Sequence, residues 1–162
     1  MTKRATPTPE AADKSLIALD RQLCFMLYSA SRAMTRAYQP MLQAMGITYP
    51  QYLVLMVMWE WCDSDIDTPS VSALGARLKL DSGTLTPLLK RMETRGLVER
   101  RRCAEDERKV LLSLTAAGES LEQQALAWVS GALEEGPVDR EELDALREKL
   151  RHFLLAIDDS HP

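Results

Sequence analysis

Cys24 is the residue of this chain best suited to redox chemistry. It is one of only three cysteines, it lies in an apolar stretch, and Tyr28 follows four residues later. Residues four apart share one face of a helix, so the Tyr28 hydroxyl could stabilise a Cys24 thiolate. The thiolate is the form of cysteine that peroxides oxidise. The same apolar surroundings also suit an unreactive cysteine in a protein core. From the residues alone, a redox sensor and a packed cysteine both remain open.

A second set of side chains suits contacts with nucleic acid. From Leu85 onward, leucines and a methionine recur at i, i+3, i+4 and i+7, which predicts a short helix with one buried face. At 100° per residue, the exposed positions around the opposite face are small, hydroxylic or basic: Gly83, Thr84, Thr86, Pro87, Lys90, Arg91 and Thr94. Hydroxyl and methyl groups can contact base edges, and cations can reach phosphates. A solvated amphipathic helix with a poorly placed proline is the alternative.

A basic hairpin is predicted directly after this helix. Two strands, over 97–103 and 109–114, are joined by an acidic turn. The first strand carries Arg100–Arg102, and Asp106 stands two residues before Arg108 at the tip. The Asp106 carboxylate is therefore expected to brace the Arg108 guanidinium as it enters a minor groove. A solvated charged turn is the alternative, but the position after two short helices favours a DNA-binding wing.

Composition limits the class of protein. The 162 residues are 46% hydrophobic and 27% charged, which suits one soluble domain with added helices and excludes disorder throughout. The longest apolar run, 52–59, is too short to span a membrane, and the N-terminus lacks the apolar stretch of a secretory signal. The cysteines at 24, 62 and 103 show no metal-ligand spacing. We expect reduced thiols, a cytoplasmic protein, and neither metal nor cofactor.

The net charge of −4 is unevenly distributed. Residues 70–115 contain ten Lys and Arg against six Asp and Glu, whereas the remainder contains ten against eighteen. A basic segment in an acidic protein suggests a local anionic partner, although solvated charge also explains many such imbalances.

Helices are expected to position both Cys24 and the predicted DNA-contacting residues. Apolar steps of three and four predict one long helix from about Lys14 to Met45, with enough apolar surface for its own domain and a partner subunit. Gly46 ends it, and Pro50 starts a helix to Cys62 that is apolar on every face and should form the centre of the core. The remaining predicted features are a helix over 71–80 capped by Ser70, a turn with a second cap over 80–83, a helix end at Gly96, a helix from Thr115 to about Leu133, a break at 136–137 and a last helix over 139–157.

Helix, turn, helix and basic hairpin together predict a mainly α winged helix-turn-helix fold, in which the helix after position 82 enters the DNA major groove. We divide the chain into a tail over 1–13, a DNA-binding domain over 47–114, and flanking helical regions over 14–46 and 115–158. The absence of His near Cys24 argues against a thiol peroxidase. A purely helical interaction module would leave the basic hairpin unexplained.

Four stretches strongly resemble the MarR-type winged-helix regulators, and among them the organic hydroperoxide resistance regulators. They read LDRQLCFMLYSASRAMTRAYQPML, ITYPQYLVLMVMWEW, LKLDSGTLTPLLKRMETRGLVERRR and EDERKVLLSLTAAG. The resemblance covers residues 16–120, more loosely the last helix, and implies a homodimer with interleaved first and last helices. It further implies a repressor, not an enzyme, that binds an inverted-repeat operator.

The resemblance also assigns roles to individual residues. It implies that Cys24 is the sensor thiol, with Tyr38 and Tyr49 as phenols from the partner subunit and Tyr28 also lining the site. Phe25 is expected to crowd any adduct formed there. The positions that match the recognition helix and the tip of the wing are Ser82, Thr84, Thr86, Pro87, Lys90, Asp106 and Arg108.

One departure concerns a second, resolving cysteine, which a subgroup of the family carries on the helix after the wing. The corresponding stretch here reads ALEEGPV and contains no thiol. The chain therefore resembles the single-cysteine type, in which a small cellular thiol captures the oxidised sulfur. Sequence predicts a repressor that releases DNA after an organic hydroperoxide oxidises Cys24. The alternative is release by a non-covalent aromatic ligand, with Cys24 structural.

Overall fold

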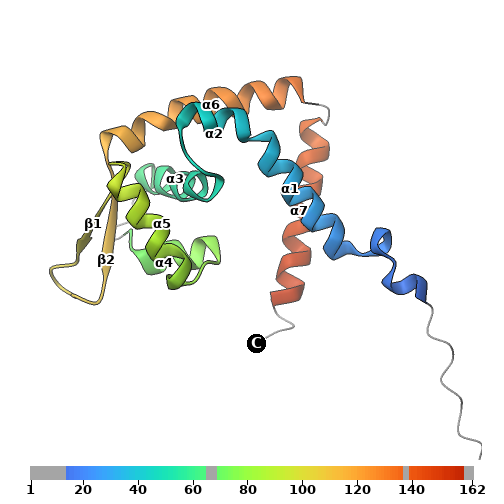
Figure 1. Ribbon diagram of the computed structural model, residues 1–162, viewed down its shortest axis with the longest axis horizontal. Helices are drawn as coiled ribbons and strands as arrows, with labels where there is room; N and C mark the ends of the chain where they lie inside the picture. Colours follow the sequence, from blue (N-terminus) through green and yellow to red (C-terminus); the bar gives the residue numbers. More distant parts are fainter. Residues whose placement is uncertain (1–13, 65–68, 137–138, 159–162) are drawn as a thin grey trace, which may run out of the picture. The chain divides into compact units, whose positions relative to one another are not determined.

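The computed structural model describes residues 14–64, 69–136 and 139–158, which belong to two compact units (Figure 1). The first unit extends to Pro40, and the second begins at Met41. The tail predicted over 1–13 lies outside the described residues. The division into dimerisation and DNA-binding regions concerns function rather than compactness and stays a prediction.

The segment over 14–45 is not one long helix, so that prediction is wrong. Two 3-10 turns, Lys14–Ile17 and Leu19–Arg21, precede helix α1, Leu23–Ala37, and a separate helix α2 covers Gln39–Met45. Cys24 is consequently the second residue of α1 rather than a residue in the middle of a helix.

Local backbone chemistry explains both interruptions. Gln22 is extended, with φ −88° and ψ 116°, and separates the 3-10 turns from α1. Pro40 has no N–H to donate to the carbonyl of Arg36, and its ring crowds that carbonyl, so the chain turns at Tyr38 and restarts. The apolar periodicity continues through both points, which is why the sequence pattern missed them.

Helix α3, Tyr49–Cys62, forms the centre of the second unit. Thr48 begins it with a capping box, in which the Thr48 backbone N–H donates to Gln51 Oε1 at 2.9 Å, and Pro50 lies in the first turn as predicted. Val54 and Leu55 are fully buried, which confirms the predicted central position.

Helices α4, Val71–Leu78, and α5, Ser82–Thr94, form the helix-turn-helix pair (Figure 1). Ser70 Oγ accepts from the Ala73 backbone N–H at 3.2 Å, which confirms the predicted cap. A Cβ on Gly75 would lie 2.8 Å from the Leu80 carbonyl oxygen. The turn between the helices therefore passes so close to α4 that only glycine fits at position 75.

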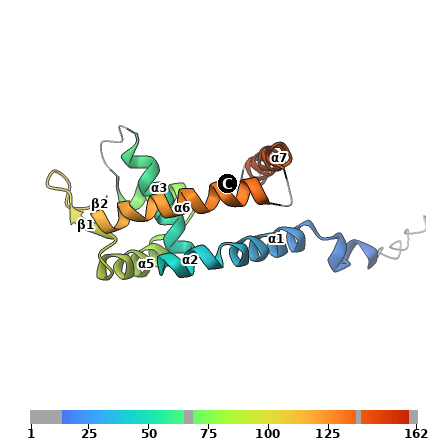
Figure 2. The ribbon, with the colours of Figure 1, turned by 90° about the horizontal axis from the view of Figure 1, so that it is seen from above.

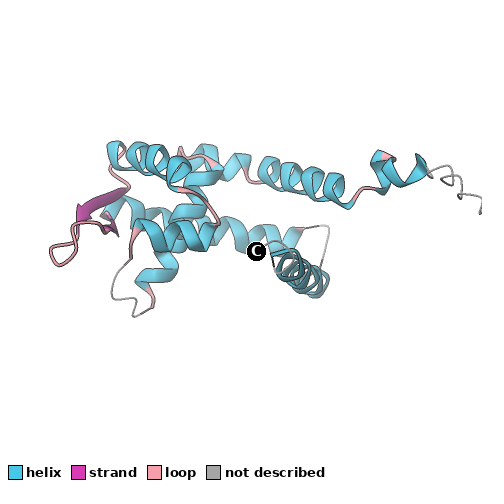
Figure 3. Cartoon of the chain, turned by 90° about the horizontal axis from the view of Figure 1, so that it is seen from below, coloured by secondary structure: helices cyan, strands magenta, loops and turns pink. Residues whose placement is uncertain are grey.

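Strands β1, Val98–Arg102, and β2, Val110–Leu114, pair antiparallel as the predicted hairpin, which Figure 3 shows in magenta. Val98 pairs with Leu114 and Arg102 with Val110. The Leu112 N–H also donates to the Pro69 carbonyl at 2.8 Å, so the segment before α4 lies along the outer edge of β2. These contacts join the wing to the helix pair.

The last two helices are α6, Ala116–Glu135, and α7, Arg140–Asp158. Leu121 and Ala125 are the buried side chains of α6, which packs against α3 and β2 (Figure 2). Among the residues that the structure describes, no helix is long and apolar enough to cross a membrane.

Candidate functional site

Helix α5 presents the predicted face. Leu85, Leu88, Leu89 and Met92 are buried, as the periodicity required. All the residues predicted to contact DNA from this helix are exposed: Ser82, Gly83, Thr84, Thr86, Pro87, Lys90 and Arg91. The exposed side chains are thus small and mostly hydroxylic at the start of α5 and basic further along the helix.

Asp81 is the N-cap at which this face begins. The sequence had placed the cap only within the turn over 80–83. Its carboxylate accepts from the Thr84 backbone N–H at 2.9 Å and from the Thr84 hydroxyl at 3.0 Å. The Thr84 backbone bond, followed by the Thr84 hydroxyl bond, holds the pKa of Asp81 below its usual range. An Asp two positions before a glycine at a predicted helix start was the signal that could have identified it.

This cap predicts a pH-dependent start of α5. Because the folded pKa is lowered, the stabilisation by Asp81 is complete above the ordinary aspartate pKa and is lost as pH falls through the lowered value. We expect Asp81→Ala to lower the Tm at neutral pH, and the difference from wild type to disappear in acid. Asp81→Asn, which caps without titrating, should keep its advantage over Asp81→Ala in acid. Thermal unfolding by circular dichroism across pH tests this, and equal curves for Ala and Asn would contradict it.

The threonine hydroxyls of α5 are already used within the helix. Thr86 Oγ1 donates to the Ser82 carbonyl at 2.7 Å, as Thr84 does to Asp81. A hydroxyl that has donated its proton still has lone pairs, so in this state these groups are acceptors for base amino groups. Pro87 has no N–H, which leaves the exposed Gly83 carbonyl without its usual helical donor.

The basic strand of the wing serves two purposes. Arg100 Nε donates to Glu93 Oε2 at 3.0 Å, which ties β1 to α5 and, with the Arg100 bonds as the first cause, lowers the pKa of Glu93. Arg101 and Arg102 are exposed instead. Arg100 therefore positions the wing, and the predicted DNA contact at Arg102 is left accessible.

At the wing tip, the predicted brace takes a different form. Asp106 Oδ1 accepts from the backbone N–H of Arg108 at 3.1 Å rather than from its guanidinium, because the two-residue spacing suits an Asx turn. The Arg108 side chain is exposed, and with Lys109, Ser72 and Ser82 it helps to line a hollow of about 300 Å³ between the wing and the helix pair. The other six lining residues are apolar or glycine, so the hollow itself does not indicate an anion site.

The thiol lies on α1. Cys24 and Tyr28 are exposed, and the Phe25 and Tyr28 rings stack with centroids 6.5 Å apart. Arg32 donates to the Tyr28 hydroxyl at 3.0 Å and lies 5.5 Å from its ring centre. Arg32 was not among the predicted site residues, although its spacing of four from Tyr28 was a usable signal.

The other two phenols are half-buried. Tyr38 lies at the turn between α1 and α2, and the Tyr49 ring is 6.3 Å from that of Tyr52 at the start of α3. Because Cys24 and Tyr38 belong to the first unit and Tyr49 to the second, a common site for the three stays a prediction.

Cys62 has an environment that disfavours its thiolate. Cys62 is exposed, yet partial desolvation raises the pKa of its thiol, and the charges of Glu119, Asp63 and Glu122 raise it further. Because the thiolate is the nucleophile, this thiol should be a poor target for oxidants at neutral pH.

This environment predicts slow alkylation of Cys62. In a Cys24→Ser, Cys103→Ser protein, the rate with iodoacetamide should be lower at neutral pH than for a short unstructured cysteine peptide with both ends blocked. It should rise with pH to a midpoint above that of the free thiol. Glu119→Gln should move this midpoint down, because it removes one of the repelling charges. Mass spectrometry of timed samples measures the rates, and a midpoint at or below that of the blocked cysteine peptide would contradict the prediction.

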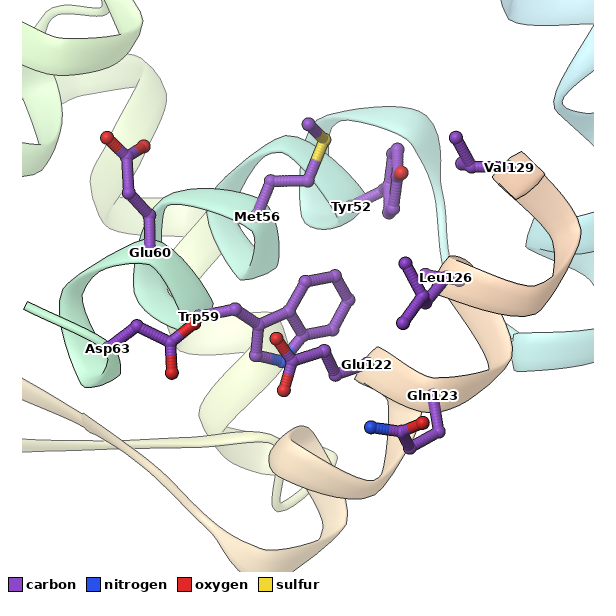
Figure 4. A pocket seen from close by; sticks show the side chains of 10 residues that line it. Tyr52, Met56, Trp59, Glu60, Asp63, Glu122, Gln123, Leu126 and Val129 are labelled. Atoms are coloured by element: carbon purple, nitrogen blue, oxygen red, sulfur yellow. The ribbon is translucent and has the colours of Figure 1, made fainter. Parts of the chain in front are cut away.

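A pocket of about 530 Å³ lies between α3 and α6 (Figure 4). Tyr52, Met56 and Trp59 line it from α3, and Leu126 and Val129 face them from α6. Acidic side chains lie at its border (Figure 4). This pocket was not predictable from the sequence, because α3 is apolar all round and its periodicity does not distinguish a pocket face from a packed one.

Comparison with known proteins agrees with this arrangement. The family model for the transcriptional regulator SarA/Rot matches residues 36–124. The chain is 53% identical over 108 residues to the organic hydroperoxide resistance transcriptional regulator of Bacillus subtilis, an alignment that covers 67% of this chain and 70% of that protein.

Solved structures with the same fold include AbfR of Staphylococcus epidermidis. Reduced AbfR bound to DNA is 33% identical, with a TM-score of 0.71 over 89% of this chain and 97% of that one. Disulfide-formed AbfR is also 33% identical, with a TM-score of 0.60 over 87% of this chain and 96% of that one. The relatives are transcriptional regulators and not enzymes. The chain belongs to the MarR/SarA-type family of winged-helix transcriptional regulators.

Proposed function

We propose that this protein is a homodimeric repressor that binds an inverted-repeat operator and releases it when an organic hydroperoxide oxidises Cys24. The observation that carries the proposal is an exposed Cys24 beside Tyr28 in a chain that is 53% identical to an organic hydroperoxide resistance regulator. A repressor acts where the chromosome is, so the proposal places the protein in the cytoplasm.

DNA binding would use the exposed face of α5 and the wing. The start of α5 would enter the major groove, where Thr84 and Thr86 offer oxygen acceptors to base amino groups. Lys90, Arg91 and Arg102 would contact phosphates, and Arg108 would reach the adjacent minor groove. In a dimer, two such helices would meet successive half-sites roughly 34–36 Å apart.

The helical regions over 14–46 and 115–158 would form the dimer. Within α1 and α7, all of whose side chains are described, none is buried. Leu23, Met26, Leu154 and Leu155 are at least half exposed, so both helices carry apolar side chains that a partner subunit would cover. Residues 47–114 would then hold the DNA-binding functions.

The chemistry proceeds in two balanced steps. The Cys24 thiolate attacks the terminal oxygen of the hydroperoxide, the O–O bond breaks, and the alkoxide takes a proton and leaves as an alcohol. This yields a sulfenic acid. A small cellular thiol then attacks the Cys24 sulfur and forms a mixed disulfide, while the sulfenic oxygen leaves as water.

Release follows from the volume of the adduct. A mixed disulfide on Cys24 would collide with Phe25, Tyr28 and the partner's tyrosines, so the first helix must shift. This shift would move the two recognition helices α5 out of register with the DNA grooves. Shifting an equilibrium from 1:99 to 99:1 takes about 5.5 kcal/mol. Overpacking costs about 1–3 kcal/mol per site, and a dimer has two such sites.

The direct test is fluorescence anisotropy on a labelled duplex from the region upstream of the protein's own gene. We expect tight binding by the reduced protein, loss of binding after one equivalent of cumene hydroperoxide with cysteine, and recovery with dithiothreitol. Salt-independent affinity would remove the DNA-binding proposal, because phosphate contacts release counterions. Tight binding that persists after peroxide treatment would contradict the redox proposal.

The pocket between α3 and α6 favours one second candidate. Its volume of about 530 Å³ and its aromatic lining suit a small aromatic ligand. In that case a reversible ligand would release the DNA, and mass spectrometry would find Cys24 unmodified.

A further inference from the structure

The first turn of α6 is joined to the end of the recognition helix α5 by an unusually direct set of contacts. Thr115 Oγ1 donates to the Gly96 carbonyl at 2.5 Å and accepts from the Gly118 N–H at 3.1 Å. The Thr115 N–H donates to the Leu97 carbonyl at 3.2 Å. One residue thus caps α6 and bonds two consecutive carbonyls of the turn that follows α5.

Gly118 adds a steric constraint to these bonds. A Cβ at this position would lie 2.2 Å from the Leu97 carbonyl oxygen, which belongs to the backbone and cannot swing aside. The Gly118 carbonyl accepts from Trp59 Nε1 at 3.1 Å, and Trp59 is 7% exposed. Gly118 is therefore held between the core helix α3 and the turn after α5.

Thr115 and Gly118 thus connect α6 to the turn after α5, a connection that we call the joint. The turn itself is continuous with the DNA-binding surface. The Leu97 N–H donates to the Met92 carbonyl of α5 at 3.0 Å, and Gly96 has a φ of +68°. Two residues into β1, Arg100 bonds back to Glu93 of α5. Helix α5, the turn and the base of the wing thus form one connected body.

Helix α6 is suited to move that body. It is a single helix of 20 residues, about 30 Å long at 1.5 Å per residue. Its first half is buried at Leu121 and Ala125, whereas Leu126 and Leu133 in the second half are 58% and 40% exposed. A partner that contacts the exposed half therefore acts on the same rigid element that is fastened at Thr115.

We propose that Thr115 and Gly118 are positioning residues that fasten α6 to the turn after α5, so that displacement of α6 moves the recognition helix and the wing together. The joint has two consequences. It sets the orientation of α5 in the reduced protein, and it transmits the change that releases DNA. The second consequence rests on the proposed redox function, and the first does not.

The test compares Thr115→Ala, which removes the hydroxyl, with Thr115→Ser, which keeps it. Val57→Ala, a buried substitution in α3, serves as a control that lowers stability without altering the joint. Each full-length protein is titrated onto the labelled upstream duplex, reduced and after cumene hydroperoxide with cysteine. The titrations are run at a temperature at which circular dichroism shows every variant folded.

We expect Thr115→Ala to weaken binding of the reduced protein about fivefold, because α5 is no longer held in its binding orientation by the Thr115 bond to Gly96, and one such bond contributes about 1 kcal/mol. Its ratio of oxidised to reduced Kd should also be smaller than that of wild type. Thr115→Ser should restore both quantities, and Val57→Ala should change neither. A Thr115→Ala protein with a lower Tm but wild-type Kd values would overturn the proposal and leave Thr115 as a helix cap alone.

The two proposals fail in different ways. If wild type keeps its DNA after oxidation, the redox function is wrong. The joint is then judged by the reduced Kd values, where an unchanged Thr115→Ala refutes it and a fivefold loss with rescue by Ser supports it.

Discussion

A Cys24→Ser protein should bind the upstream duplex as tightly as wild type and keep it after treatment with cumene hydroperoxide and cysteine. The same treatment should weaken DNA binding by wild type about 100-fold, within the usual range for coupling between two sites. Anisotropy titrations before and after oxidation give both Kd values. The two proteins should therefore be indistinguishable when reduced and clearly different when oxidised.

The expected equality in the reduced state follows from the size of the side chain. Serine has nearly the volume of cysteine, so replacement of Cys24 leaves almost no cavity even where the partner's phenols pack against this position. The DNA-binding face belongs to the second unit and contains none of the altered atoms. The expected difference after oxidation follows from chemistry, since a serine hydroxyl forms neither a sulfenic acid nor a disulfide.

Cys103→Ser provides the matched control. Cys103 is half-buried at the end of β1 and belongs to the wing, so an oxidation that acted on the DNA-binding surface directly would act there. We expect this variant to release DNA like wild type. Release by Cys24→Ser together with retention by Cys103→Ser would reverse the assignment of the sensor, and mass spectrometry would then find the cysteine adduct at Cys103.

The winged helix-turn-helix was predictable because its signals are local. Ser70 and Thr115 are caps whose side-chain bonds form within three residues, and the buried positions of α5 repeat within a single helix. The hairpin was predicted from alternation and from its acidic turn. Each element needed only neighbouring residues to be recognised, and each was confirmed to within two residues of its ends.

The errors arose where backbone chemistry or distant partners decide the outcome. Apolar spacing continued through Gln22 and Pro40, but an extended residue and a missing N–H interrupted the helix there. Arg100 was grouped with its neighbours because a sequence does not show that Glu93 lies beside it. The predicted meeting of Cys24 with Tyr38 and Tyr49 of a partner depends on a second copy of the chain, which the spacing of residues in one chain does not describe.

Gly118→Ala should be the most damaging single-methyl substitution that we predict. The new Cβ would lie 2.2 Å from the Leu97 carbonyl oxygen, so the turn after α5 or the start of α6 must move. Overpacking of this kind costs about 3 kcal/mol at the upper end of its usual range. For a chain of this length, that lowers the Tm by roughly 6–12 °C.

Gly131→Ala is the control, because it places the same methyl group in the same helix with nothing within 4 Å. Alanine is the better helix former by about 1 kcal/mol, so this variant should be as stable as wild type or slightly more stable. Thermal and urea unfolding followed by circular dichroism measure both changes. Equal Tm values for the two alanine variants would mean that Leu97 does not lie against Gly118. The opposite signs expected here would instead establish that α6 is fastened to the recognition helix at its first turn.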